Sequence, residues 1–211
     1  QFIEHAIISP IFNQNGEITH YMAIKEDISA RKQSEEIIWR QANFDPLTQL
    51  PNRSLFLYRL KNAIPYTNRD KSSLALLFLD LDHFKEVNDL LGHDYGDLLL
   101  IEAARRILDC VRDTDTVARF GGDEFVLLLT NIKLEVGIDK VTRKILDALS
   151  KPFHLNNETA SVSASIGVTT CPEDATDITT LLKNADLAMY LAKSAGRNCW
   201  RSFTDVGAAN S

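Results

Sequence analysis

Two glycines are followed by two acidic residues in the segment Gly121, Gly122, Asp123 and Glu124. Glycine adopts a positive φ without a steric penalty, so the pair predicts a tight turn between two strands. Because neither glycine has a side chain, a ligand can also approach the backbone closely. Acidic residues at a hairpin tip are more often solvated turn residues, so this segment alone indicates a turn rather than a site.

A second acidic segment, Asp80-Leu81-Asp82, follows the apolar run at residues 74–79. The run predicts a buried strand, and Asp80 would lie at its carboxyl end, where open sheets often place ligands. Asp82 is better interpreted as the N-cap of a following helix. If the glycine hairpin lies beside this strand, Asp80 and Asp123 converge. Two carboxylates, completed by a carbonyl, phosphate oxygens and water, would suit Mg²⁺.

The composition excludes several classes of protein. The 211 residues include 23 Lys and Arg against 29 Asp and Glu, a formal charge of -6, so a generally basic nucleic-acid binder is not expected. No apolar run reaches the roughly 18 residues of a membrane span. Three widely spaced cysteines, Cys110, Cys171 and Cys199, exclude a disulfide scaffold and a cysteine-based zinc module, and they indicate a reducing compartment.

The hydrophobic pattern predicts an α+β domain preceded by two smaller parts. Residues 1–26 read as two strands around the Asn15-Gly16 turn, and the charged segment 29–43 reads as a helix. Further helices are expected over residues 53–63, 84–91, 98–110, 136–149 and 178–193, and strands over 74–80, 116–120, 125–130, 162–168 and 199–203. Asn52 and Asp97 are predicted N-caps. One direct hairpin among alternating elements favours a central mixed, largely antiparallel sheet flanked by helices.

Four segments together resemble the GGDEF family of diguanylate cyclases: RFGGDEF, then FLDLDHFKEVNDLLGHDYGD and DPLTQLPNR upstream of it, and AKSAGRN downstream. The resemblance implies a fold like that of nucleotidyl cyclases and polymerase palms. It implies that two GTP molecules are joined into cyclic di-GMP with release of two pyrophosphates, each 3′-hydroxyl attacking the other α-phosphate. A homodimer and Mg²⁺, with Mn²⁺ as a substitute, are implied as well.

The resemblance assigns roles residue by residue. Asp80, Asp123 and the Leu81 carbonyl match the metal ligands, and Glu124 matches a second acid that would tune the metal or assist proton removal. The positions matching substrate-binding residues are Phe84, Lys85, Asn88, Asp97, Gly121, Gly122, Lys193 and Arg197. Asn88 and Asp97 match the guanine readers, and a carboxylate can accept from guanine N1–H, which adenine lacks. Lys193 also suits a helix C-terminus without any ligand.

The segment from Arg112 to Asp115 resembles the RxxD motif of an inhibitory product site. It precedes the predicted strand at residues 116–120, so this site would lie at the opposite end of that strand from Gly121. Arg143 is a candidate to complete it. A local surface pair of Arg112 and Asp115 is the alternative, and such a pair stabilises little.

The segment ISPIFNQNGEITHYMAIKEDIS resembles, more weakly, the last two strands of a PAS sensor domain. The expected layout is a PAS-like remnant at residues 1–28, a linker helix at 29–43, the GGDEF domain at 44–205 and a tail at 206–211. A signalling linker and a solvated connector are equally supported for the helix. We expect a cytoplasmic enzyme that contacts neither a nucleic-acid polymer nor a membrane. The alternatives are a non-catalytic GTP or cyclic di-GMP receptor and a scaffold for an attached phosphodiesterase domain.

Overall fold

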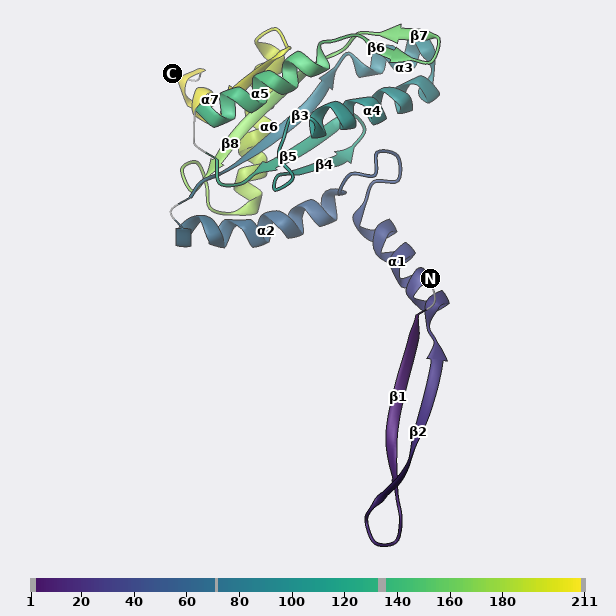
Figure 1. Cartoon of the computed structure of the whole chain (residues 1–211). Helices are drawn as coiled ribbons and strands as arrows, with labels where there is room; N and C mark the ends of the chain where they lie inside the picture. The colour runs from purple at the N-terminus through teal and green to yellow at the C-terminus, as the bar shows by residue number, and fades with distance from the viewer. Residues whose placement is uncertain (1–2, 71, 133–135, 210–211) are drawn as a thin grey trace. The chain divides into compact units, whose positions relative to one another are not determined.

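The computed structural model describes residues 3–70, 72–132 and 136–209, and the chain divides into two compact units, Gln1–Ala42 and Asn43–Ser211 (Figure 1). The first unit contains an antiparallel hairpin of β1 (Glu4–Phe12) and β2 (Ile18–Asp27), followed by α1 (Ser29–Asn43). The hairpin around Asn15-Gly16 and the helix that follows it are confirmed. Helix α1 buries none of its side chains, in agreement with its high charge.

The second unit is built on a five-stranded sheet of order β4-β5-β3-β8-β9. The central strand β3 (Leu74–Asp82) runs antiparallel to both β5 (Glu124–Leu129) and β8 (Ser163–Cys171). Strand β4 (Thr116–Gly121) is antiparallel to β5, whereas β9 (Cys199–Ser202) is parallel to β8. The predicted mixed, largely antiparallel sheet is therefore confirmed.

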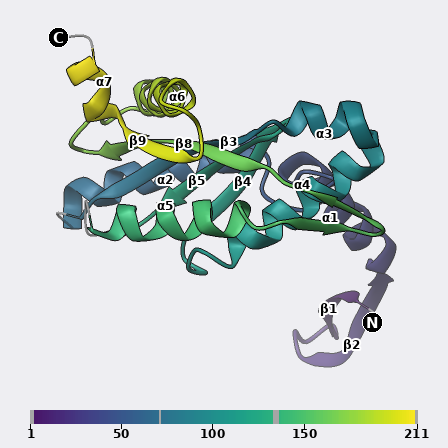
Figure 2. The same ribbon diagram turned by 90° about the horizontal axis from the view of Figure 1, so that it is seen from above.

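Helices cover both faces of this sheet. They are α2 (Arg53–Asp70), α3 (Phe84–Leu91), α4 (His93–Leu108), α5 (Val136–Leu149) and α6 (Ile178–Ser194). One hydrophobic cluster joins α4 and α5 to one face, and a second joins α2 and α6 to the other. Figure 2 shows α5 and α6 on opposite sides of the strands. None of the helices in the described ranges is long and apolar enough to cross a membrane.

Strand β3 distributes its side chains between the two clusters with a period of two. Leu79 and Leu81 belong to the α4–α5 cluster, and Phe78 belongs to the α2–α6 cluster. By the same alternation, Asp80 and Asp82 lie on the α2–α6 face. The first chemical consequence of the fold is that both carboxylates of this strand face the same layer of helices.

Several predicted boundaries differ from the structure. Helix α2 continues past Pro65, because Ile64 packs on the second cluster and the buried Thr67 hydroxyl donates to the Ile64 carbonyl. Helix α4 begins at His93, so the prediction that Asp97 caps a later helix is wrong. The reason is Gly92, which at φ 93° ends α3 and starts α4 with no loop between them.

Other elements were predicted correctly or missed. The Asn52 cap is confirmed, because its Oδ1 accepts from the Leu55 amide at 3.1 Å. The short hairpin of β6 (Phe153–Leu155) and β7 (Glu158–Ala160) was missed. The terminal helix α7 (Phe203–Ala209) was also missed, and it spans the predicted boundary between domain and tail. Residues 1–2 and 210–211 of the predicted outer segments lie outside the described residues.

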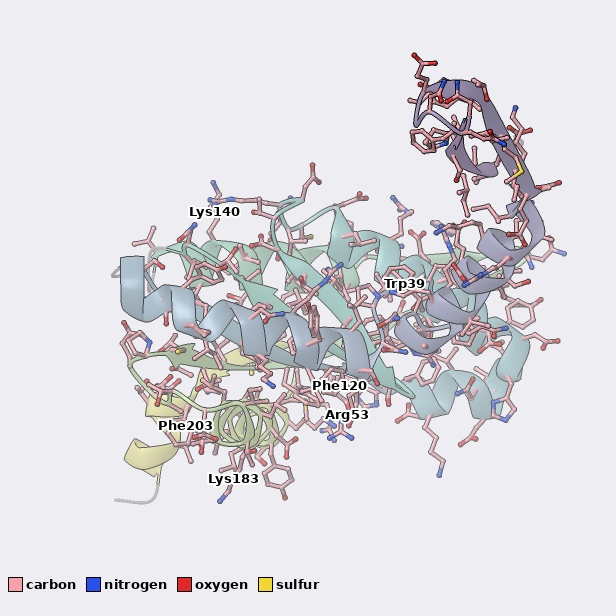
Figure 3. All side chains as sticks on the ribbon, turned by 90° about the horizontal axis from the view of Figure 1, so that it is seen from below. Trp39, Arg53, Phe120, Lys140, Lys183 and Phe203 are labelled. Atoms are coloured by element: carbon pink, nitrogen blue, oxygen red, sulfur yellow. The ribbon has the colours of Figure 1, made fainter. Side chains whose placement is uncertain are left out.

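The segment that precedes α2, at residues 45–52, is held against β4 by contacts with Arg119. Arg119 donates its backbone amide to the Pro51 carbonyl at 3.1 Å, and its guanidinium pairs with Asp45 at 3.0 Å. The guanidinium of Arg53, the first residue of α2, lies 5.8 Å from the ring centroid of Phe120, which follows Arg119 in β4 (Figure 3). These contacts hold the start of α2 against the strand that leads into the glycine turn.

Candidate active site

Three acidic residues, Asp80, Asp123 and Glu124, lie where β3 and β5 reach the glycine turn. Asp80 is directly opposite Glu124 in the register of these strands, and the Leu81 amide donates to the Asp123 carbonyl at 3.3 Å. The predicted convergence of Asp80 with Asp123 is supported by this geometry. Glu124, two residues before the buried Val126, lies on the same α2–α6 face as Asp80.

The charges of this cluster act on one another. Burial raises the pKa of Asp80, and the neighbouring charge of Asp123 raises it further, against a hydrogen bond from Lys193 that lowers it. Burial also raises the pKa of Glu124, with added repulsion from Asp80, Asp123 and Asp186. Mutual repulsion of carboxylates in a partly buried site favours the binding of a cation.

Asp186 is an acidic residue near the site that the sequence reasoning did not consider. It is an exposed residue of α6 whose charge reaches Glu124. The available signal was its spacing: Asp186 and Lys193 are seven residues apart on one helix, and this distance places both on one face.

Two basic residues, one in the last turn of α6 and one just after the helix, face the strand carboxylates. The Lys193 ammonium lies 2.8 Å from Asp80 Oδ1, and Arg197 Nε lies 4.0 Å from Asp82 Oδ1. Their side chains are 30% and 50% exposed, so both remain accessible to a ligand. Gly196 and Arg197 both have positive φ values, 107° and 64°, which turn the chain back toward β3 after the helix ends.

The interpretation of Asp82 as a helix N-cap is wrong. His83, in the left-handed conformation at φ 65°, occupies the cap position of α3 and makes no side-chain cap hydrogen bond. The buried Asp82 carboxylate instead accepts from the hydroxyls of Ser163 at 2.6 Å and Ser165 at 2.7 Å, and from the Asn198 amide at 3.2 Å. Asp82 therefore ties β3 to β8 and to the segment that carries Arg197.

The glycine turn has the predicted conformation. Gly121 and Gly122 have φ values of 152° and 52°, and a Cβ atom at either would meet nothing within 4 Å. Conformation rather than crowding therefore requires glycine, and the surface above the turn is open. Arg119 holds the turn by donating from Nε and Nη2 to the Gly122 carbonyl at 3.0 and 2.8 Å.

The candidate base readers lie on two consecutive helices. Asn88 belongs to α3 and Asp97 to the second turn of α4, with Phe84 buried beneath them and Lys85 exposed. The side-chain oxygen of Asn88 is buried and has no hydrogen-bond partner among the described residues. A buried side-chain oxygen without a donor requires an explanation.

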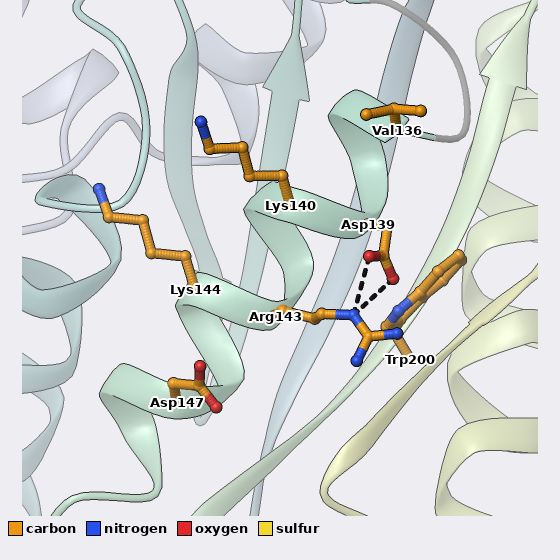
Figure 4. A pocket seen from close by; sticks show the side chains of 7 residues that line it. All are labelled: Val136, Asp139, Lys140, Arg143, Lys144, Asp147 and Trp200. Atoms are coloured by element: carbon orange, nitrogen blue, oxygen red, sulfur yellow. Dashed lines mark hydrogen bonds and ion pairs between the residues drawn. The ribbon is translucent and has the colours of Figure 1, made fainter.

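The candidate inhibitory residues lie at the other end of β4. Asp115 accepts from the Arg112 amide at 3.0 Å through Oδ2 and from the Thr130 amide at 3.2 Å through Oδ1, while Arg112 is exposed. Figure 4 shows Arg143 pointing toward Asp139 and Trp200, and its Nε lies 2.7 Å from Asp139 Oδ1. These residues line an open groove of about 760 Å³. Asp115 thus has a structural role, and the contribution of Arg143 stays a prediction.

Oxygen donors that could hold a cation lie at the end of β3 and beside the glycine turn. No cluster of three or more His, Cys, Asp or Glu side chains in the ranges 3–70, 72–132 and 136–209 is arranged as a ready metal centre. The carboxylates of Asp80 and Asp123 nevertheless repel each other in a partly buried place, and the main chain at Leu81 adjoins both. Oxygen donors of this kind suit Mg²⁺, which keeps water and substrate phosphates among its ligands. The residues present therefore fit the ion.

Comparison with known proteins identifies the family of the chain. Residues 42–199 match the family model described as "Diguanylate cyclase, GGDEF domain". The chain is 44% identical over 182 residues to the bifunctional diguanylate cyclase/cyclic di-GMP phosphodiesterase MucR of Pseudomonas aeruginosa, covering 86% of this chain and 26% of MucR. It is 41% identical over 178 residues to the diguanylate cyclase TpbB of Pseudomonas aeruginosa, covering 83% of this chain and 41% of TpbB.

A solved structure shares the fold. The GGDEF domain of TpbB superposes with a TM-score of 0.75 at 39% identity, over 80% of this chain and 99% of that domain. The chain spans between about a quarter and two fifths of the length of the two curated relatives. The sequence motifs, the fold and these comparisons agree, and the chain belongs to the GGDEF domain family.

Proposed function

We propose that this chain is a diguanylate cyclase, which condenses two GTP molecules into cyclic di-GMP and releases two pyrophosphates. One observation carries the proposal. Asp80 and Glu124 are paired on the neighbouring strands β3 and β5, the charge of Asp123 acts on Asp80, and the Lys193 ammonium lies 2.8 Å from the Asp80 carboxylate. Acidic and basic groups at one sheet end suit a metal–triphosphate substrate. A non-catalytic receptor would not need all three carboxylates.

Mg²⁺, or Mn²⁺ in its place, would be held by Asp80, Asp123 and the Leu81 carbonyl. When bound, the ion neutralises phosphate charge and favours attack by a hydroxyl. Glu124 would either tune that ion or take the proton of the attacking 3′-hydroxyl. Its raised pKa, caused first by burial, is compatible with a proton-accepting role.

The chain's other site residues would bind and orient GTP. Lys193 and Arg197 would pair with the triphosphate, as would Lys85 with the neighbouring backbone of Phe84. The open backbone of Gly121 and Gly122 would lie against the nucleotide. Asn88 and Asp97 would read guanine, because a carboxylate can accept from both N1–H and the 2-amino group.

Two copies of the chain are needed for the reaction. Each site would hold one GTP, and each 3′-oxygen attacks the α-phosphorus of the GTP held by the other copy. A two-fold symmetric product therefore requires a two-fold symmetric pair of sites. Cyclic di-GMP would also bind at Arg112 and Asp115 and inhibit the enzyme.

The outer segments would carry regulation. We propose that residues 1–28 are the end of a PAS-like domain and that residues 29–43 link it to the catalytic domain. Supporting this, the hairpin exposes large apolar side chains that a longer sheet could cover, namely Ile7, Ile8, Ile11, Phe12, Ile18, Tyr21, Met22 and Ile24. The cytoplasm, which supplies GTP, is the compartment that the proposal requires.

The test is to incubate the purified chain with GTP and Mg²⁺ and to identify the product by mass spectrometry. We expect cyclic di-GMP from the parent protein and none above background from Asp80→Asn, whose fold should be retained. Asp147→Asn changes an exposed carboxylate of α5 and serves as the matched control with parental turnover. Near-parental turnover by folded Asp80→Asn would contradict the assignment. GTP binding without product would instead support the receptor.

A further inference from the structure

A glycine inside α4 and an unpaired amide on α3 occupy the same place. Gly96 is buried, and a Cβ atom built on it would overlap Asn88 Oδ1 and lie 3.0 Å from Asn88 Cγ and 3.3 Å from the Phe84 ring. The amide oxygen of Asn88 therefore fills the notch left by the missing side chain. Among the buried side-chain nitrogen and oxygen atoms of the described residues, this oxygen is the one without a hydrogen-bond partner.

Both features oppose stability. Gly96 lies within a regular helix, where alanine is favoured over glycine, and its φ is not among the positive values that would require glycine. A buried carbonyl oxygen without a donor is unfavourable as well. Local choices that conflict with stability concentrate at functional sites. We therefore expect this pair of residues to serve ligand binding, through the orientation in which the Asn88 amide is held.

The notch determines which groups Asn88 can offer. With its oxygen packed against the α-carbon of Gly96, the amide retains only the two N–H donors of Nδ2 for a ligand. The reverse orientation would press those donors against an α-carbon, which cannot accept a hydrogen bond. Among purines, a 6-oxo group accepts from such a donor, whereas the 6-amino group of adenine is itself a donor.

We propose that Gly96 is a specificity-determining residue, which holds Asn88 as a donor-only contact and so favours 6-oxopurine over 6-aminopurine nucleotides. The inference rests on the proposed use of Asn88 as a guanine reader. It adds that the selectivity depends on the absence of a side chain at a position that need not touch the base.

The experiment is a double-mutant cycle of Gly96→Ala and Asn88→Ala, with affinity measured by calorimetry for the α,β-methylene analogues of GTP and ATP, which cannot be cyclised. Gly96→Ala should weaken the GTP analogue by roughly 5- to 100-fold and leave the weaker ATP analogue unchanged. In the Asn88→Ala background, Gly96→Ala should cause no further loss, because the notch is then empty.

Thermal unfolding gives a second readout that needs no ligand. Gly96→Ala should lower the midpoint in the parent but raise it by up to about 2–4 °C in the Asn88→Ala background, where the gain in helix propensity is opposed only by the contact with the Phe84 ring. If Gly96→Ala alone does not fold, the double variant should. Gly137→Ala is the matched control: it is also a helical glycine, but its Cβ would meet only the flexible Ile132 side chain. It should leave nucleotide binding unchanged.

Equal losses for the two analogues, or the same loss with and without the Asn88 amide, would overturn the inference. An unfolded double variant would do so too. Failure of the proposed function is distinguishable: selective binding of the GTP analogue by a parent that forms no cyclic product contradicts the cyclase and supports the role of Gly96. A parent that binds neither analogue would overturn both.

Discussion

Replacing Asp82 should show how much its hydrogen bonds, which join β3 to β8 and to the segment after α6, contribute to the free energy of unfolding. Its buried carboxylate accepts from Ser163, Ser165 and the Asn198 amide at 2.6, 2.7 and 3.2 Å. Asp82→Ala leaves the Asn198 amide without an acceptor and both hydroxyls without a charged partner. Losing these three hydrogen bonds to a buried carboxylate should cost about 3–5 kcal/mol, because a hydrogen bond to a charged group contributes about 1.5–3 kcal/mol and only the Ser165 donor is itself buried. For a unit of this size, the unfolding midpoint should fall by about 6–20 °C.

Asp82→Asn separates the charge from the hydrogen-bond pattern. The amide oxygen can still accept from Ser163 and Asn198, and the Ser165 hydroxyl can turn to accept from the new N–H. The expected loss is therefore smaller, about 1–2 kcal/mol. Combining Asp82→Ala with Ser165→Ala should destabilise by less than the sum of the two single changes, because the two residues share one interaction.

The assay is urea unfolding followed by circular dichroism, with the slope compared to ensure that one transition is measured. A midpoint for Asp82→Ala that corresponds to less than about 0.5 kcal/mol of destabilisation would refute the reasoning, since that is the range of surface substitutions. Equal losses for the alanine and asparagine variants would refute the part assigned to the hydrogen bonds.

Two further predictions concern arginines. Arg106 donates to the carbonyls of Ala148, Lys151 and Pro152 at and just after the end of α5. Because a lysine ammonium cannot reproduce this fork of donors, Arg106→Lys should lower the free energy of unfolding, measured by urea unfolding, by about 2–4 kcal/mol. Arg105→Lys, on a side chain 61% exposed, is the control and should stay within about 0.5 kcal/mol. In titrations of cyclase activity with cyclic di-GMP, Arg112→Ala should require more product for inhibition than the parent. Equal inhibition of both proteins, or of neither, would reduce Arg112 to a surface residue.

The sequence predicted what depends on local pattern. Alternation and apolar runs located the five strands of the main sheet but not the short β6–β7 hairpin, and the glycine pair located the turn between β4 and β5. Asp82 and Asp97 were both misinterpreted as caps for one reason: an acid before an apolar helical run satisfies the local pattern for a cap. The partners that decide the role of Asp82 lie 81, 83 and 116 residues away in the chain, so no local window contains them.

The change from the hydrophobic core to the polar site takes place between two neighbouring sets of paired residues on the three central strands. In the register of the three central strands, Phe78 is paired with Val126 and Gly167, and these residues lie under α2 and α6. Two residues further along β3, Asp80 is paired with Glu124 and Ser165. Because side chains two apart share a face, one step of the pleat changes the surface from apolar to polar.

Core packing also sets the position of the Lys193 ammonium in the site. A Cβ atom on Gly167 would overlap the Ala185 carbonyl and the Met189 amide, so β8 and α6 approach each other backbone to backbone at this point. Lys193 follows Met189 by one helical turn and reaches Asp80 from there. A partly exposed ion pair contributes little on its own. The close approach at Gly167, rather than the pair itself, therefore fixes the ammonium beside the carboxylates.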